Sequence, residues 1–451
     1  QEIEIRRTGS WLDYPARGII RGRWEICCYE VNKGIPVGYF VGPEIVMAPP
    51  AERAQNPFPF TGRVLDSLPP DVRAVTDEDV KKVQEEARAL VRAQALARSR
   101  SFALSARHIS DLARFNRVEG LALGTGFIQR LGAGVAVTAA GRYGFSDNQV
   151  KGRGALEYRT GAGSSLVVAA ERQYRDVSDE QETSLVRNTI AAQEFGSDYT
   201  DTYDARTVSV SGSLGRLGWR PSFEVAYERH EPLLVHARPA NGSFEQTIPA
   251  RPLHESRFTA AFDRPTTLTF GGYELGVHLG LSGIMRGSAT DSLRGQFFRP
   301  SVSVDLQKPF GSSRLLLHTV ASSIFSGDAV PAQHLVYLGG PTTGPGYDFH
   351  EFVGRAGASQ RVEYRFLAPF VAIPLGRFGR APGTITLAPF ATAVWIDRSP
   401  TFTSVRQGWY PSLGLGALTV FDVLRLDVAR GLRGGRWTFS LDIGRDFWSV
   451  L

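Results

Sequence analysis

The chain has 451 residues, of which 42% are hydrophobic and 21% charged, and its formal net charge is +6. No run reaches the roughly 18 to 20 apolar residues that a membrane-spanning helix needs, which argues against a helical membrane protein. The basic residues are scattered instead of forming a patch interleaved with aromatic residues, so nucleic-acid binding has no support. A membrane β-barrel stays compatible, because alternating strands average to weak hydrophobicity.

The N-terminal part differs from the rest of the chain. Residues 1–60 contain short strand-like pieces and end in a Pro-rich stretch. We expect a small periplasmic β-segment here, either by itself or as the end of a larger module. Residues 61–99 are expected to be a connector with one helix at 76–98, because Thr76 can cap it and Asp79 follows three residues later, as in a capping box.

Two adjacent cysteines, Cys27 and Cys28, lie in the β-segment. Neighbouring cysteines seldom bridge each other, because the resulting ring is strained. We interpret them as small, partly buried strand residues.

From residue 100 to the end, apolar and polar residues alternate in strand after strand. In segment 437–443, for example, every odd position is apolar and every even position is polar. Such alternation gives each strand one apolar and one polar face. Many of these strands reach ten residues, near the length that crosses a bilayer at a tilt. We therefore predict that residues 100–451 form an all-β membrane domain, a 16-stranded antiparallel transmembrane β-barrel with a polar lumen.

Connection lengths support this prediction. The expected strands cover residues 100–109, 118–128, 134–144, 150–160, 165–175, 205–214, 219–230, 254–264, 270–284, 296–307, 312–325, 358–367, 384–397, 410–420, 422–430 and 436–447. The three long connections, 176–204, 231–253 and 326–357, then all lie at one end of the barrel. Long loops at one end and mostly short turns at the other are typical of outer-membrane barrels with periplasmic termini.

A motif in the longest connection resembles a known family. Gly339 and Gly340 are followed by Gly346 and Tyr347, and the next strand contains the sequence Glu-Tyr-Arg at 363–365. This pattern is similar to the BamA-type (bacterial surface antigen) superfamily of outer-membrane assembly and translocation barrels. The resemblance covers about residues 100–451 and implies a Gram-negative outer-membrane location, with the N-terminal part in the periplasm.

The sequence departs from the family in two ways. The arginine that the family carries at the loop tip is replaced by Pro345, which offers neither charge nor donor. The contact that this arginine makes with the lumen wall must therefore be absent or be made by another residue, such as Arg355. Residues 1–98 also hold too little helix for two of the family's periplasmic POTRA repeats.

Charged residues of two strands should face the lumen. On the polar faces of their strands lie Arg361, Glu363, Arg365, Arg425 and Asp427. We expect them to form a hydrogen-bonded plug with loop 326–357; the alternative is that they line a path for an ion or a substrate.

The junction of the first and last strands is the expected place of opening. In the last strand, Trp437, Phe439, Gly444 and Phe447 mark this seam, and Gly444 could kink the strand and weaken its pairing. A nascent strand could then add to the exposed edge by β-augmentation.

Motifs for catalysis or metal binding are missing from the sequence. The eight histidines are scattered, and no HExxH, GxSxG or Walker-type motif occurs. Asp198, Asp201 and Asp204 could hold calcium, although a solvated surface loop is the default interpretation. We expect no enzyme activity, no cofactor and no metal.

The function that these observations predict is binding of other envelope polypeptides, with assistance in their assembly or translocation. The alternative is a non-catalytic structural or anchoring subunit of a larger outer-membrane complex, and a third possibility is a diffusion channel. Expected partners are outer-membrane lipid and lipopolysaccharide, and other envelope proteins or barrel precursors; no nucleic acid is expected.

Overall fold

A computed structural model describes the backbone of residues 2–11 and 14–23 and most of residues 101–448. Gaps in the second range fall at 105, 107–108, 162, 216–218, 269–271, 288–294, 373, 375, 377–380, 382, 398–406 and 446–447. The chain divides into two units, Gln1–Leu90 and Val91–Leu451, and each is described by itself.

The first unit contains a β-hairpin. Its strands β1 (Glu2–Trp11) and β2 (Tyr14–Arg23) pair antiparallel along their whole length, from Glu2 opposite Arg23 to Trp11 opposite Tyr14. The hairpin lies within the expected β-segment 1–60. The expected connector helix 76–98 and both cysteines lie outside the described residues.

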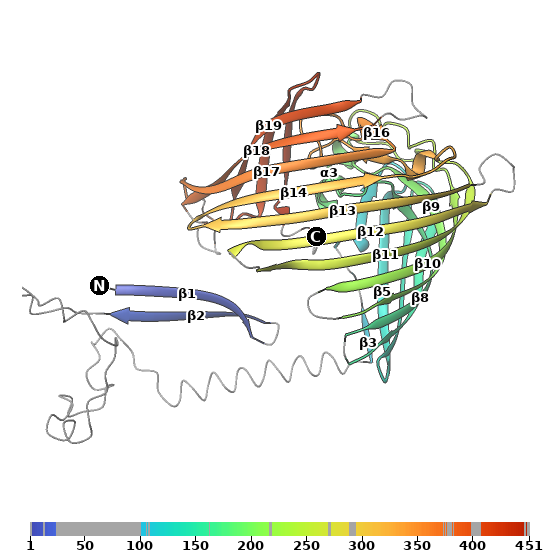
Figure 1. Cartoon of the computed structure of the whole chain (residues 1–451), viewed down its shortest axis with the longest axis horizontal. Coiled ribbons are helices and arrows are strands. Elements are labelled where there is room, and N and C mark those ends of the chain that lie inside the picture. The colour runs from blue at the N-terminus through green and yellow to red at the C-terminus, as the bar shows by residue number, and fades with distance from the viewer. Residues whose placement is uncertain are drawn as a thin grey trace, which may run out of the picture. The chain divides into compact units, whose positions relative to one another are not determined.

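The second unit is one large antiparallel sheet that curls round into a barrel wall (Figure 1). Its strands are β3 (Phe102–Leu104), β4 (Ala113–Asn116), β5 (Gly120–Gly132), β6 (Val135–Gly144), β7 (Gln149–Arg159), β8 (Ser165–Asp176), β9 (Thr202–Ser213), β10 (Arg220–Glu231), β11 (Leu253–Leu268), β12 (Glu274–Gly287), β13 (Gly295–Phe310), β14 (Ser313–Ser323), β17 (Ala356–Pro369), β18 (Thr384–Ile396), β19 (Gly408–Thr419), β20 (Leu424–Gly431) and β21 (Trp437–Ile443). From β5 onward each wall strand pairs with the next one along the chain.

The expected first strand, 100–109, is wrong as one continuous strand. Strands β3 and β4 both pair with β5, and a short 3-10 helix, η3 (Ile109–Asp111), separates them. The chain can detour here because Gly124 of β5 has no side chain. A Cβ on Gly124 would lie 2.4 Å from the Asp111 carbonyl oxygen, so the close approach requires glycine.

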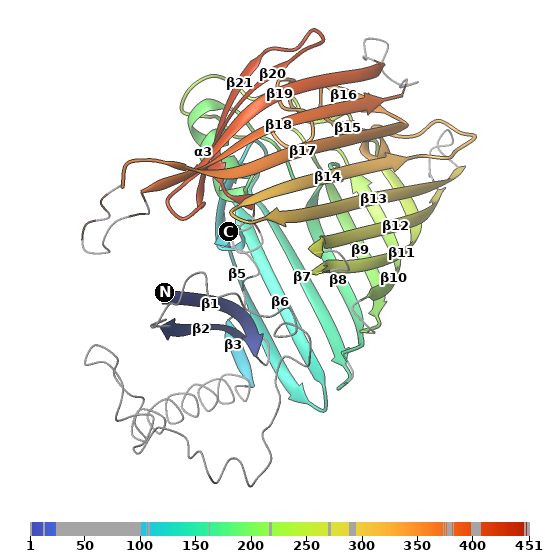
Figure 2. The ribbon, with the colours of Figure 1, turned by 60° about the vertical axis from the view of Figure 1, so that its left-hand side comes forward.

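The long connections all leave the same end of the sheet, called the loop end here (Figure 2). The β8–β9 connection contains helix α3 (Leu185–Phe195). The β14–β17 connection, residues 324–355, contains the 3-10 helix η5 (Ala332–His334) and a small hairpin of β15 (Val336–Leu338) and β16 (Phe352–Gly354). We call residues 324–355 the plug.

The apolar face of the wall points away from the interior. In β17, Val362 and Tyr364 are 39% and 42% exposed, whereas Arg361 and Glu363 between and beside them are 5% and 4% exposed. The same alternation recurs around the wall, with exposed apolar residues such as Leu166, Val168, Val208, Val210, Phe223, Val225, Leu279, Leu281, Leu413, Leu415, Leu424 and Leu426. The sheet therefore has an apolar outer surface, and its polar side chains lie inside.

The apolar core lies between the plug and the inner wall at the loop end. Leu335, Val336 and Phe352 of the plug are among its most buried members, together with Val394 and Ile396 of β18. No helix in the described part of the chain is long and apolar enough to cross a membrane.

Candidate functional site: the plug and the seam

The glycines of the motif allow the tip of the plug to reach the last strands. Gly339, Gly340 and Gly346 have φ angles of 109°, 121° and 89°, a region that favours glycine. Gly346 donates from its N–H to the Thr438 hydroxyl of β21 at 3.0 Å, and its carbonyl accepts from the Arg436 N–H at 2.8 Å. The motif predicted from the sequence is thus a contact between plug and wall.

Tyr347 anchors the same tip. Its hydroxyl donates to the Pro411 carbonyl of β19 at 2.8 Å and accepts from the Arg433 N–H at 3.2 Å. Its ring packs edge-on against Phe352 and Tyr410. The ring and hydroxyl together hold the tip against β19 and the β20–β21 connection.

Side chains of the wall, instead of an arginine at the tip, join the plug to β17. Pro345 is buried, and the wall supplies the donors: Arg361 donates to the Pro341 carbonyl at 3.4 Å, and Ser359 to the Thr343 carbonyl at 2.6 Å. The expected substitute, Arg355, donates to the Ser326 carbonyl within the plug.

The predicted lumen-facing residues form one ionic network beneath the tip. Glu363 lies 2.9 Å from Arg361, 2.7 Å from Arg365 and 2.7 Å from Arg425. Arg425 also pairs with Asp427 at 2.9 Å. Strands β17 and β20 are not neighbours in the sheet, so the Glu363–Arg425 pair spans the inner surface of the wall.

A cavity of about 300 Å³ adjoins this network. Besides the arginines above, its lining includes Glu180 from the β8–β9 connection, His318 of β14 and Arg445 beyond β21. The cavity is therefore lined by both basic and acidic side chains, the acidic ones being Glu180, Asp305 and Glu363.

The β8–β9 connection holds the plug from the other side. The buried carboxylate of Glu182 accepts hydrogen bonds from the Thr342 N–H at 2.7 Å, the Thr343 N–H at 3.1 Å and the Thr343 hydroxyl. Burial raises the pKa of Glu182, and these hydrogen bonds oppose the shift only in part.

The aspartates of this connection are not solvated, so the default interpretation of a surface loop is wrong. Asp201 bonds to His350 at 2.7 Å and to Arg117 at 2.5 Å. Burial alone would raise the pKa of Asp201, but the His350 hydrogen bond and the Arg117 charge lower it. Asp198 is held by Arg117 and Asn188, and Asp204 by Arg172. Arginines thus already neutralise these carboxylates, which disfavours a calcium site.

Helix α3 is hydrogen-bonded both to the last strand, β21, and to β4 near the start of the sheet. Ser184 is its N-cap, and Asp442 of β21 accepts hydrogen bonds from both the Ser184 N–H, at 3.0 Å, and the Ser184 hydroxyl. On the other side, the Thr189 hydroxyl accepts from the Phe115 N–H of β4 at 3.3 Å. Figure 2 shows α3 beside β21 and the β20–β21 hairpin. A carboxylate at the positive N-terminus of a helix is electrostatically favourable.

Helix α3 lies at the junction of the last strand with the first strands. Strand β21 neighbours β3 and β4 in the order of the sheet, but no backbone ladder joins them within the described residues. Trp437 and Phe439 lie on the outer face and are 62% and 76% exposed.

The prediction of a last strand that runs to 447 is wrong, because β21 ends at Ile443. The Gly444 N–H still donates to the Val423 carbonyl at 2.7 Å, in register with the β20–β21 pairing. Phe447 lies outside the described residues.

The sequence analysis missed the seam helix, although its signals are present. Ser184 at the N-cap and Gly196 at the C-cap, with φ of 67°, are ordinary helix boundaries. The eleven residues between these caps lie in a long connection between two strands, and the strand pattern gave no reason to expect a helix there.

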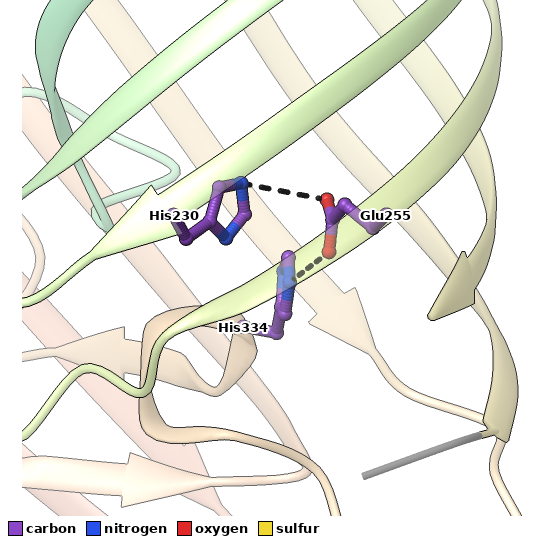
Figure 3. Close-up of side chains that lie close together, drawn as sticks. All are labelled: His230, Glu255 and His334. Atoms are coloured by element: carbon purple, nitrogen blue, oxygen red, sulfur yellow. Dashed lines mark hydrogen bonds and ion pairs between the residues drawn. The ribbon is translucent and has the colours of Figure 1, made fainter. Parts of the chain in front are cut away.

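A cluster of two histidines and a glutamate was also missed (Figure 3). His230 of β10, Glu255 of β11 and His334 of η5 lie far apart in sequence, so no motif spacing reveals them. Strand register brings His230 close to Glu255, but only the folding of the plug adds His334. Burial lowers the pKa of His334, although the Glu255 carboxylate opposes the shift.

Comparisons with known proteins give distant similarities. The model of the C-terminal domain of a family of unknown function, DUF5686, matches residues 94–307. No curated protein matches the chain.

Several solved structures are similar to this chain at low identity. BamA from Haemophilus ducreyi lacking POTRA domains 1–3 is 14% identical, with 73% of this chain and 68% of that chain covered and a TM-score of 0.47. CdiB from Acinetobacter baumannii is 14% identical, with 73% and 58% covered and a TM-score of 0.39. OccK3 (OpdO) from Pseudomonas aeruginosa is 14% identical, with 75% and 90% covered and a TM-score of 0.30. This chain thus spans less than two thirds of the CdiB chain and slightly more than two thirds of the BamA chain.

Proposed function

We propose that the second unit is an outer-membrane β-barrel of sixteen strands, in which β3 and β4 together form the first strand, and that the N-terminal part lies in the periplasm. The exposed apolar outer face supports this proposal, because contact between water and so extended an apolar surface is unfavourable. A bilayer would cover it, and the ionic network inside would stay in contact with a polar lumen.

We propose further that the barrel binds other envelope polypeptides and assists their assembly or translocation. The observation that carries this proposal is the seam, where α3 is hydrogen-bonded both to the Asp442 side chain of β21 and to the Phe115 N–H of β4. Lipopolysaccharide and lipid would surround the barrel, and precursors of other barrels would be its substrates.

The energetics of the seam favour exchange. Unpaired backbone N–H and C=O groups at a strand edge cost several kcal/mol in hydrocarbon. Each hydrogen bond that holds α3 contributes only about 1 kcal/mol net. An incoming strand that pairs with β21 or β4 would therefore gain more than the departure of α3 costs, and β-augmentation would proceed.

The alternative function, a structural or anchoring barrel, has its own supporting observation. The plug is bonded to β17, β19, β21 and the β8–β9 connection, so the lumen is held shut at its tip. In an anchoring subunit the seam would stay closed throughout.

A reversible tether at the seam separates these functions. In a Cys27→Ser/Cys28→Ser background, Ser184→Cys with Asp442→Cys joins α3 to β21 through side chains that are in contact. The protein is reconstituted in liposomes, and folding of an added outer-membrane barrel precursor is followed by its heat-modifiable migration. We expect the oxidised tether to stop assistance and a reductant to restore it.

A matched control places the disulfide within the wall. Ser209 and Ala226 are register partners in β9 and β10, so Ser209→Cys with Ala226→Cys should leave assistance unchanged. Equal assistance with the seam tether oxidised and reduced would contradict the seam mechanism. No assistance by the untethered protein would favour the anchoring function.

A further inference from the structure

The histidine–glutamate cluster lies where the plug meets the wall, away from the seam. His230, Glu255 and His334 are 0%, 1% and 8% exposed, so all three side chains are cut off from bulk water. Figure 3 shows the two imidazoles on either side of the Glu255 carboxylate. His334 Nε2 lies 2.7 Å from Glu255 Oε2, and His230 Nε2 lies 3.7 Å from Glu255 Oε1.

Among the described residues, no arginine or lysine lies within ion-pair distance of Glu255, although Arg286 is its register partner in β12. The neighbouring carboxylate, Glu228, pairs with Arg175 at 2.6 Å and with Arg257 at 2.8 Å. Among the described residues, the ion-pair contacts of Glu255 are with His230 and His334 alone. Burial of a carboxylate without an arginine or lysine in direct contact is costly, so a bound cation between the imidazoles would stabilise Glu255.

Two atoms of the cluster that could bind a metal ion lack hydrogen-bond partners in the described structure. Glu255 Oε1 and His230 Nδ1 are buried and make no hydrogen bond within the described structure. Glu255 Oε1 points toward His230 Nε2 across the 3.7 Å gap, so a carboxylate lone pair is available inside the cluster.

The spacing of the donors suits a small metal ion. One ligand atom from each side chain lies within 4.8 Å of the other two. Ligand bonds of about 2.0 to 2.2 Å in a tetrahedral zinc site place donor atoms roughly 3.3 Å apart. Small side-chain rotations would widen the 2.7 Å separation, narrow the 3.7 Å separation and admit an ion.

We propose that His230, Glu255 and His334 bind a divalent transition-metal ion, with Zn²⁺ the best match to two imidazoles and one carboxylate. The ion would displace the proton on an imidazole nitrogen to solvent and supply the charge that Glu255 needs. Glu228, which now lies 3.0 Å from His230 Nε2, would give up this hydrogen bond when that nitrogen binds the ion and would keep its arginine partners. The metal would fasten η5 of the plug to β10 and β11.

Metal titration of the full chain in detergent tests this proposal. The protein is stripped with a chelator and titrated with Co²⁺, whose visible ligand-field bands report tetrahedral nitrogen and oxygen ligands, and Zn²⁺ is then added in competition. We expect one Co²⁺ per chain, displaced by one equivalent of Zn²⁺. Glu255→Gln and His334→Gln should weaken binding by at least about tenfold.

The control variant changes a histidine beside the cluster. His254 adjoins Glu255 in β11, but its side chain contacts Tyr227 on the opposite face, so His254→Gln should bind metal normally. Heat-modifiable migration verifies that each variant is folded.

Absence of saturable Co²⁺ and Zn²⁺ binding in the wild-type chain would overturn the proposal and assign the cluster to a shared proton. Unchanged affinity in folded Glu255→Gln would overturn it as well. If both variants fail to fold, the zinc-edge X-ray absorption spectrum of the wild-type chain decides, since the proposal requires two imidazoles in the zinc shell.

Discussion

At the scale of single residues, the tip of the plug requires glycine at position 346, because atoms of Gly431 already fill the place where a side chain would begin. A Cβ on Gly346 would lie 2.1 Å from the Gly431 nitrogen, and its φ of 89° is unfavourable for other residues. The neighbouring Tyr347 then aims its hydroxyl at Pro411. The absence of a side chain at Gly346 thus allows Tyr347 to anchor the tip of the plug to β19.

Gly346→Ala should detach the tip of the plug from β19 and β21. Strained backbone costs about 1 to 3 kcal/mol, and the overlap with Gly431 adds to that cost. Hydrogen exchange should show faster amide exchange in residues 339–347. Gly327→Ala, where a Cβ on a plug glycine meets nothing within 4 Å, should exchange as the wild type does. Equal exchange in both variants would contradict this account.

The motif residues could be predicted from the sequence because they are close together in the chain. Gly339, Gly340, Gly346 and Tyr347 fall within nine consecutive positions, and the structure places Gly346 and Tyr347 against β21 and β19. The partner of the tip could not be predicted. Arg361 donates to a plug carbonyl, and a carbonyl leaves no trace in a side-chain pattern.

At the scale of elements, the β8–β9 connection acts as a clamp on the plug. Glu182 binds the backbone of Thr342 and Thr343, and His350 of the plug binds Asp201 and Ser178. The same connection contributes α3 to the seam. Movement of α3 would therefore pull on a segment that also holds the plug.

The clamp should respond to pH through Glu182. Because burial raises the folded-state pKa of Glu182 above its ordinary value of 4.5, its contribution to stability is complete below pH 4.5 and falls as pH rises through the folded-state value. Glu182→Gln keeps a carbonyl acceptor but cannot ionise. The stability of the wild type relative to this variant should therefore decrease from about pH 4 to about pH 8, as measured by thermal unfolding in detergent.

Glu180→Gln serves as the control for this prediction. Glu180 lies in the same connection but contacts the lumen near His318, so its substitution should leave the Glu182-dependent trend in place. A relative stability of Glu182→Gln that stays constant with pH would refute the predicted role.

At the scale of the whole molecule, the two faces of the wall suit different environments, the outer face an apolar one and the inner face a polar one. Leu279, near the middle of β12, is 42% exposed on the outer face, and its neighbour His278 lies on the inner face with Asp263. Alternation along one strand is enough to place adjacent residues in these two environments.

Leu279→Arg should therefore impair folding into a bilayer. A charged residue on the lipid face costs about 2 to 4 kcal/mol near the midplane, whereas a lumen position tolerates it. His278→Arg, which places a cation opposite Asp263, is the matched control. Folding into liposomes, measured by heat-modifiable migration, should fall for the first variant only; equal folding of both would contradict the outward orientation of the apolar face.

The sequence by itself determined most of the wall strands and which of their faces is apolar, because the period-two pattern is local and recurs along the chain; it did not determine the division of residues 100–109 or the end of the last strand. It also determined the three long connections at one end. Only the tertiary structure decided what those connections do inside the wall. The Glu182 clamp, the α3 bridge and the His230–Glu255–His334 cluster each join residues from distant connections or strands, and their contacts depend on how the loops fold inward, which no local pattern records.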